Sequence, residues 1–149
     1  MPEREQAERW LGRPISPENW ARASLAADRV LLRAGARRPS EVAWDEGLQI
    51  VVSCSDHRVG PLRFRARLEG RRITVYRSGL EELAVSHPLD LALAHELFHW
   101  FEPAFPQPEL GAHLLATRWL RLPRFAGLLE PRTARELARC DARGTGGTR

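Results

Sequence analysis

The feature that most constrains this chain is a pair of histidines four residues apart, His95 and His99, inside an uncharged stretch. On an α-helix this spacing puts both imidazoles on one face, one turn apart, where they can bind the same metal ion. Glu96 lies one step round the helix, in a position to accept a proton from a water at that ion. Residues 92–101 carry no other charge, which is typical of a buried helix. The alternative interpretation is two core histidines with ordinary hydrogen-bond partners.

The H-E-x-x-H pattern is typical of zinc metallopeptidases, in which three protein groups bind the ion and a fourth position stays open. The third ligand is sought among four residues. Glu102 would make three ligands from one straight helix, and Asp90 lies off the face of the two histidines. Glu109 and His113 lie four residues apart on the next predicted helix, so both face the same way, and geometry alone does not separate them.

The composition is that of an ordinary globular protein. The chain has 149 residues, of which 43% are hydrophobic and 28% charged, enough for one domain. No apolar run approaches the ~20 residues of a membrane span, and no signal peptide is visible, so we expect a cytoplasmic protein that does not bind membranes. The net charge is +4, but the arginines are spread among acidic residues, which favours a solvated surface over direct nucleic-acid binding.

The two cysteines, Cys54 and Cys140, lie far apart in the sequence and suggest no disulfide framework. Cys54 lies within an apolar run, and we expect it to be a buried free thiol. This expectation also favours the cytoplasm.

Periodicity and capping residues predict an α+β fold. Ser16 and Pro17 are a typical helix start, Pro88 fits the first position of the motif helix, and Pro103 ends that helix. The predicted helices are 3–12 with Trp10 and Leu11 inward, 17–34, 79–83, 88–102, 109–122, 124–129 and 133–142. The predicted strands are 48–54, 62–68 and 72–76, and the predicted turns and loops include 37–40 and 56–61.

The strands predict a small antiparallel sheet of about three strands, packed on the H-E-x-x-H helix with flanking helices. We expect a single domain over 1–143, with an N-terminal helical part at 1–37 and a catalytic core at 48–123. Residues 144–149 are expected to be a flexible tail.

Residues 48–123 resemble the ImmA/IrrE-type metallopeptidases, whose fold is zincin-like. The resemblance rests on His95-Glu96-Leu97-Phe98-His99, on the run from Glu109 to Ala116, and on Pro123, which together are similar to H-E-x-x-H followed by E-x-x-A-N-x-F-A-x-x-L-L-x-P. It implies one Zn²⁺ per chain, with His95, His99 and Glu109 as ligands and Glu96 as the catalytic base. His113 stands where the family usually has Asn or Asp beside a zinc-binding histidine, which leaves open an exchange of roles with Glu109.

The resulting hypothesis is a zinc-dependent endopeptidase. His113 is the candidate donor to the oxyanion of the transition state, with Tyr76 and His87 as alternatives. The substrate could add as a strand to a sheet edge, which we place at 72–77. The resemblance implies a protein substrate, a helix-turn-helix transcriptional repressor. The competing hypothesis is a catalytically silent zinc-binding interaction module.

Overall fold

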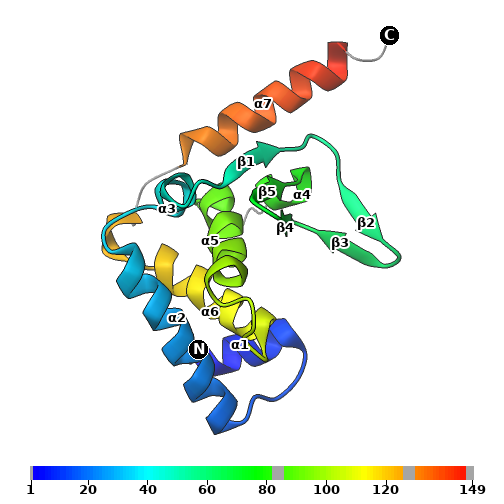
Figure 1. Cartoon of the computed structure of the whole chain (residues 1–149). Helices are drawn as coiled ribbons and strands as arrows, with labels where there is room; N and C mark the ends of the chain where they lie inside the picture. Colours follow the sequence, from blue (N-terminus) through cyan, green and yellow to red (C-terminus); the bar gives the residue numbers. More distant parts are fainter. Residues whose placement is uncertain (1, 82–85, 126–129, 147–149) are drawn as a thin grey trace.

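The structure is a computed structural model that describes residues 2–81, 86–125 and 130–146 (Figure 1). The helices within these residues are α1 (Glu3–Leu11), α2 (Pro17–Ala34), α3 (Pro39–Asp45), α4 (Arg77–Leu80), α5 (Pro88–Phe101), α6 (Pro108–Leu120) and α7 (Pro131–Gly146), with a 3₁₀ turn at Pro123–Phe125. The strands are β1 (Gln49–Val52), β2 (His57–Val59), β3 (Leu62–Phe64), β4 (Ala66–Glu69) and β5 (Arg72–Val75). The predicted α+β class is therefore confirmed.

The main sheet has three strands in the order β1-β5-β4, and β2 and β3 pair separately as an antiparallel hairpin. β4 is antiparallel to β5, with Leu68 opposite Ile73, as expected for strands joined by a short turn. β1 is parallel to β5, with Ile50 opposite Ile73, so the prediction of an antiparallel sheet is wrong for this pair. The prediction of 72–77 as an edge is also wrong, because β5 is the central strand.

Helix α5 lies at the centre of the fold, between α6 and the sheet (Figure 1). Its Leu93, Leu97 and Phe98 are fully buried, as are Ile73 and Val75 of β5. α5 begins at Pro88, whose missing N–H is not needed in the first helical turn, and it ends at Phe101, just before Pro103. Because α5 is covered on several sides, it can be apolar nearly all round.

A glycine allows α5 and α6 to approach closely. A β-carbon at Gly111 would lie 2.0 Å from Cζ of Phe98, far inside van der Waals contact. Phe98 lies between His95 and His99 on α5, and Gly111 lies between Glu109 and His113 on α6. The absent side chain therefore sets how near these residues come to α5.

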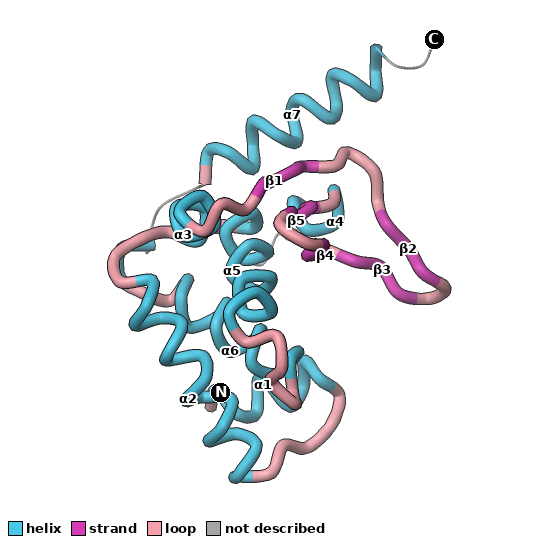
Figure 2. Tube along the Cα trace, in the orientation of Figure 1, coloured by secondary structure: helices cyan, strands magenta, loops and turns pink. Residues whose placement is uncertain are grey.

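The local predictions hold best where capping residues act. The Ser16 hydroxyl accepts a hydrogen bond from the Asn19 amide at 3.1 Å, and α2 ends at Ala34 as predicted. Residues 39–45 form α3, which the loop prediction for 37–40 missed. Residues 57–59 form β2 rather than part of a turn, and the predicted strand 62–68 divides into β3 and β4 at Arg65. Figure 2 shows these strands grouped on one side of the helical part.

Three of the predicted segments, 79–83, 124–129 and 144–149, extend beyond the residues that the structure describes. Of the predicted helix 79–83, only residues up to Leu80 lie in α4, and 82–85 are outside the described residues. Residues 126–129 of the predicted helix 124–129 are likewise outside them. The predicted tail 144–149 is wrong for residues 144–146, which continue α7, and 147–149 are not described.

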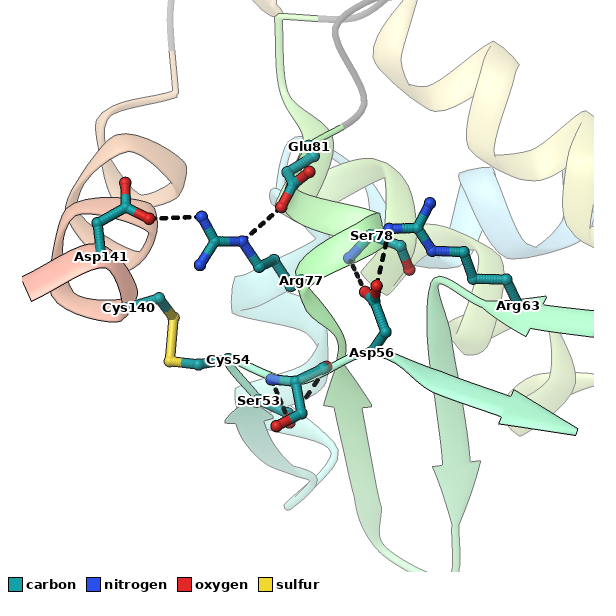
Figure 3. Close-up of polar contacts among 10 residues, drawn as sticks. Ser53, Cys54, Asp56, Arg63, Arg77, Ser78, Glu81, Cys140 and Asp141 are labelled. Carbon is teal, nitrogen blue, oxygen red and sulfur yellow. Dashed lines mark hydrogen bonds and ion pairs between the residues drawn. A yellow bond between two sulfur atoms is a disulfide. The ribbon is translucent and has the colours of Figure 1, made fainter. Parts of the chain in front are cut away.

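Cys54 and Cys140 form a disulfide, so the expectation of a buried free thiol is wrong (Figure 3). Cys54 lies in the loop after β1 and Cys140 in α7, 86 residues later, with their Cα atoms 5.3 Å apart. No local pattern predicts this bond, because the two sulfurs meet only when α7 lies beside the end of β1. The bond joins the C-terminal helix covalently to the sheet.

Polar contacts beside the disulfide reinforce the attachment of α7. Arg77 at the start of α4 forms ion pairs with Asp141 of α7 and with Glu81 (Figure 3). Arg139 of α7 donates a hydrogen bond to the Val52 carbonyl of β1 at 3.3 Å. α7 therefore contacts the outer edge of β1. Within the described part of the chain, none of the helices is both long and apolar enough to cross a membrane.

Candidate metal centre

The two motif histidines share one face of α5, as their spacing predicts. The ring centroids of His95 and His99 are 5.2 Å apart, and each side chain keeps 23% of its surface exposed. The histidines are thus on the wall of the fold rather than in its core. The alternative of two core histidines would bury both rings, whereas here both remain accessible from solvent.

Glu109 lies against both histidines. One carboxylate oxygen is 3.1 Å from Nε2 of His95, and the other is 3.2 Å from Nε2 of His99. Helix α6 presents Glu109 in its first turn, after the chain has reversed through residues 102–107. The structure therefore brings together the first two predicted ligands and Glu109.

The three residues fit a zinc ion. One ligand atom from each of His95, His99 and Glu109 lies within 4.8 Å of the others. Ligands about 2.1 Å from a tetrahedral zinc are separated by about 3.4 Å, close to the observed separations between the carboxylate and the imidazoles. Two imidazoles and one carboxylate are a donor set that zinc accepts in catalytic sites. Glu109 is 54% exposed, which leaves the cluster open on one side.

The cluster is electrostatically self-complementary. Hydrogen bonds from His95 and His99 hold the pKa of the Glu109 carboxyl well below its usual range. The same contact with Glu109 raises the pKa of His99. Glu109 is therefore ionised at neutral pH, as a metal ligand must be.

Glu96 lies beside this cluster and is only 7% exposed. Its carboxylate is 3.9 Å from Nε2 of His95, too far for a hydrogen bond. Burial is the largest influence on it and raises its pKa, and the charges of His95 and His99 partly offset this rise. A hydrogen bond from the Leu68 backbone amide also lowers the pKa and is the smallest of these effects. A carboxylate with a raised pKa accepts a proton more readily near neutral pH than an exposed one.

The Leu68 amide is a site group that sequence reasoning missed. Leu68 belongs to β4, and its N–H points away from β5 because the flanking pairs, Arg67 with Thr74 and Glu69 with Arg72, carry the ladder hydrogen bonds. The edge strand and the proposed base are thus in direct contact. A side-chain pattern cannot reveal this contact, since any residue at position 68 has the same amide except proline.

His113 is close to the cluster but outside it. It lies one turn after Glu109 on α6, and its ring stacks on Trp10 of α1, with centroids 4.6 Å apart and planes 20° apart. Burial, with a smaller contribution from the charge of His95, lowers the pKa of His113 to about 4. His113 is therefore a neutral imidazole at pH 7.

Trp10 was expected to point inward, but it is 45% exposed and contacts the candidate metal site formed by His95, His99 and Glu109. Besides stacking on His113, its ring lies edge-on to His95, with centroids 6.2 Å apart. A tryptophan at the end of a short helix usually packs into a core, so the sequence carried no signal for this position.

The other four candidates are engaged elsewhere. Glu102 pairs with Arg29 at 2.7 Å, and the buried Asp90 pairs with Arg38 at 2.8 Å. Each carboxylate therefore has a cation of its own. The two rival donors to the oxyanion are also occupied, since the Tyr76 ring stacks on His57 with centroids 5.2 Å apart and the buried His87 contacts Ser86 and Phe125.

No protein-family model, curated protein or solved structure matches this chain. The function of this chain is therefore inferred from the geometry of the site.

Proposed function

We propose that this chain is a zinc-dependent endopeptidase that hydrolyses a peptide bond in a protein substrate. The observation that carries the proposal is the arrangement of Glu109 across His95 and His99, with the buried carboxylate of Glu96 beside them. A structural zinc site has no need of a second, non-ligating carboxylate, and it closes its coordination shell with protein groups. The exposure of Glu109 instead favours an open, catalytic position.

A zinc ion held by His95, His99 and Glu109 would act as a Lewis acid, lowering the pKa of a water molecule and polarising the substrate carbonyl. Glu96 accepts the proton from that water and later donates it to the leaving amine. The Leu68 amide lies on the side of Glu96 and favours the ionised form of its carboxylate. His113, neutral at pH 7, keeps one ring N–H and is our candidate donor to the developing oxyanion.

The β4 edge is the proposed binding surface for the substrate backbone. β4 is the last strand in the order β1-β5-β4, and it contacts α5. An extended peptide can add to such an edge by main-chain hydrogen bonds, which would lay its carbonyl groups along the metal cluster. This replaces the predicted edge at 72–77, which the structure places in the middle of the sheet.

The resemblance to ImmA/IrrE-type enzymes implies a transcriptional repressor as the substrate and the cytoplasm as the place of action. The Cys54–Cys140 disulfide is more typical of an oxidising compartment. We therefore propose the substrate by its chemistry, as an extended protein segment, and the repressor as the first protein class to assay. Assays on the oxidised and reduced forms of the enzyme belong in the same experiment.

The test compares the wild-type protein with Glu96→Gln on a library of unstructured peptides, both loaded with zinc. We expect cleavage by the wild type and a loss of about 10²–10⁴-fold in Glu96→Gln, with zinc retained, because the glutamine amide cannot accept the proton. Equal cleavage by the two proteins would contradict the mechanism. Stoichiometric zinc without cleavage of any peptide or repressor would instead favour the silent zinc-binding module.

A further inference from the structure

Trp10 presents an indole to solvent directly beside the metal cluster. One part of the ring is covered by His113 and another lies edge-on to His95, yet 45% of the residue stays exposed. By contrast, Trp119 of α6 is fully buried, and its indole N–H is satisfied by the Arg37 carbonyl. Trp10 thus contacts His95 and His113 and still keeps a large part of its surface free.

The position of Trp10 is fixed by contacts elsewhere on α1. Arg118 of α6 forms two hydrogen bonds to the Glu3 carboxylate, each 2.8 Å long, and Arg121, just after α6, donates to the Gln6 side chain. Ala7 on the same helix is fully buried. The bidentate guanidinium–carboxylate contact sets the orientation of α1 as well as its position. These contacts lie one to two turns before Trp10, so α1 holds the indole beside the site without depending on the metal.

The end of α1 keeps the space beyond the indole open. Gly12 has a φ of 74°, a left-handed conformation that ends the helix two residues after Trp10. The chain then passes to α2, where Ser16 begins the next helix. The helix therefore stops before its own next turn could cover the indole.

We propose that Trp10 is a specificity-determining residue that receives an aromatic or large apolar side chain of the substrate, next to the bond that is cut. This inference rests on the proposed function, which supplies the substrate. The contact between Trp10 and a bound ligand requires only an occupied metal site. A ligand whose carbonyl reaches the cluster of His95, His99 and Glu109 has the exposed indole within reach of its neighbouring side chain. Stacked and edge-on aromatic pairs are favourable and geometrically selective, which an aliphatic wall would not be.

The test uses two hydroxamates, which chelate zinc through the same group and differ in what they present to the indole. Acetohydroxamate carries a methyl group, and phenylacetohydroxamate carries an aromatic ring one carbon from the chelating group. Their dissociation constants for the zinc-loaded protein are measured by calorimetry in the wild type, Trp10→Ala, Trp10→Phe and the control Trp44→Ala. Trp44 is a matched control because it is also an exposed tryptophan on a helix, in α3, at 80% exposure.

We expect the wild type to prefer phenylacetohydroxamate and Trp10→Ala to lose that preference by about tenfold, with acetohydroxamate binding unchanged. Trp10→Phe should keep most of the preference, and Trp44→Ala all of it. An unchanged preference in Trp10→Ala would overturn the inference. Loss of zinc from Trp10→Ala and Trp10→Phe alike would also overturn it, because the indole would then only hold the metal ligands in place.

The outcomes separate this inference from the proposed function. If no peptide is cleaved but the hydroxamate preference depends on Trp10, the subsite stands and the peptidase proposal falls. If peptides are cleaved and the cleavage profile of Trp10→Ala matches that of the wild type, the peptidase proposal stands and the subsite falls.

Discussion

The two edge strands of the three-stranded sheet, β1 and β4, contact different parts of the molecule. At the β1 edge, α7 is attached by the Cys54–Cys140 disulfide, and Arg139 donates to the outward-facing Val52 carbonyl (Figures 1 and 3). At the β4 edge, the outward-facing amide of Leu68 donates to Glu96, the proposed base. Exposed strand edges invite unwanted pairing with other chains, and proteins usually cover or blunt them.

If the proposed function holds, the β1 edge contributes to stability and the β4 edge to catalysis. The β1 edge is joined to α7 at its C-terminal end, whereas the Leu68 amide of the β4 edge points toward Glu96. Damage at the β1 edge should therefore lower stability and leave the site intact, and damage at the β4 edge should do the reverse.

Removal of the disulfide is expected to have the largest effect. The double variant Cys54→Ala with Cys140→Ala opens a covalent loop that spans 86 residues of sequence. We expect the free energy of unfolding to fall by about 2–4 kcal/mol, because the unfolded chain gains conformational freedom. Chemical denaturation measures the loss, and zinc content should stay at the wild-type level. Loss of zinc without loss of stability would show that the two edges are not separate.

Proline at the two edges compares them directly. Leu68→Pro removes the amide that donates to Glu96, and Val52→Pro removes an amide that also points away from β5. We expect Leu68→Pro to lower kcat/KM for a cleaved peptide about a hundredfold, since the proposed base loses a hydrogen-bond donor. Val52→Pro should change kcat/KM no more than about twofold, because β1 is remote from the base. Similar losses of activity in the two variants would refute the comparison.

Substitution of Glu130, just before α7, is expected to change the free energy of unfolding least. Glu130 connects the start of α7 to α5. It is buried, and its carboxylate accepts a hydrogen bond from the Asp90 amide at 3.3 Å. Burial and the nearby Asp90 raise the pKa of Glu130 from 4.5 to about 7. The folded state therefore binds more protons than the unfolded state between pH 4.5 and 7, and this group makes stability fall as the pH rises through that range.

The variant Glu130→Gln should abolish this dependence and make the protein more stable than the wild type above pH 7, by about 1–2 kcal/mol. The gain is smaller than the full linkage energy because the buried amide group of glutamine needs partners of its own. Denaturation at pH 5 and pH 8 measures both predictions. A wild-type protein whose stability rises from pH 5 to pH 8 by the same amount as that of the variant would disprove the assignment to Glu130.

Local signals predicted much of the fold. The Ser16 cap, the proline at the start of α5 and the four-residue spacing of His95 and His99 act within one or two helical turns, so the sequence displays them directly. From the residues alone, the choice of third ligand could be narrowed to two residues on α6, Glu109 and His113. The structure separates the two, because Glu109 contacts both motif histidines whereas His113 stacks on Trp10.

The remaining features arise only when distant segments meet. The parallel pairing of β1 with β5, the disulfide to α7 and the covering of the β1 edge all join segments far apart in sequence. The division of the predicted strand at Arg65 follows from pairing with two different partners, β2 and β5. The exposure of Trp10 depends on where α6 holds α1. None of these leaves a periodic pattern in the residues concerned.

The most direct test of the account is the zinc content of the purified protein, measured by mass spectrometry beside Glu109→Ala, His113→Ala and Glu102→Ala. Glu102 is the matched control because it is a glutamate, like Glu109, and follows the motif histidines at the end of α5. Its carboxylate pairs with Arg29 instead of the histidines. The account predicts one zinc per chain in the wild type, in His113→Ala and in Glu102→Ala, and its loss in Glu109→Ala. Zinc retained by Glu109→Ala, or no zinc in the wild type after zinc is supplied, would contradict it.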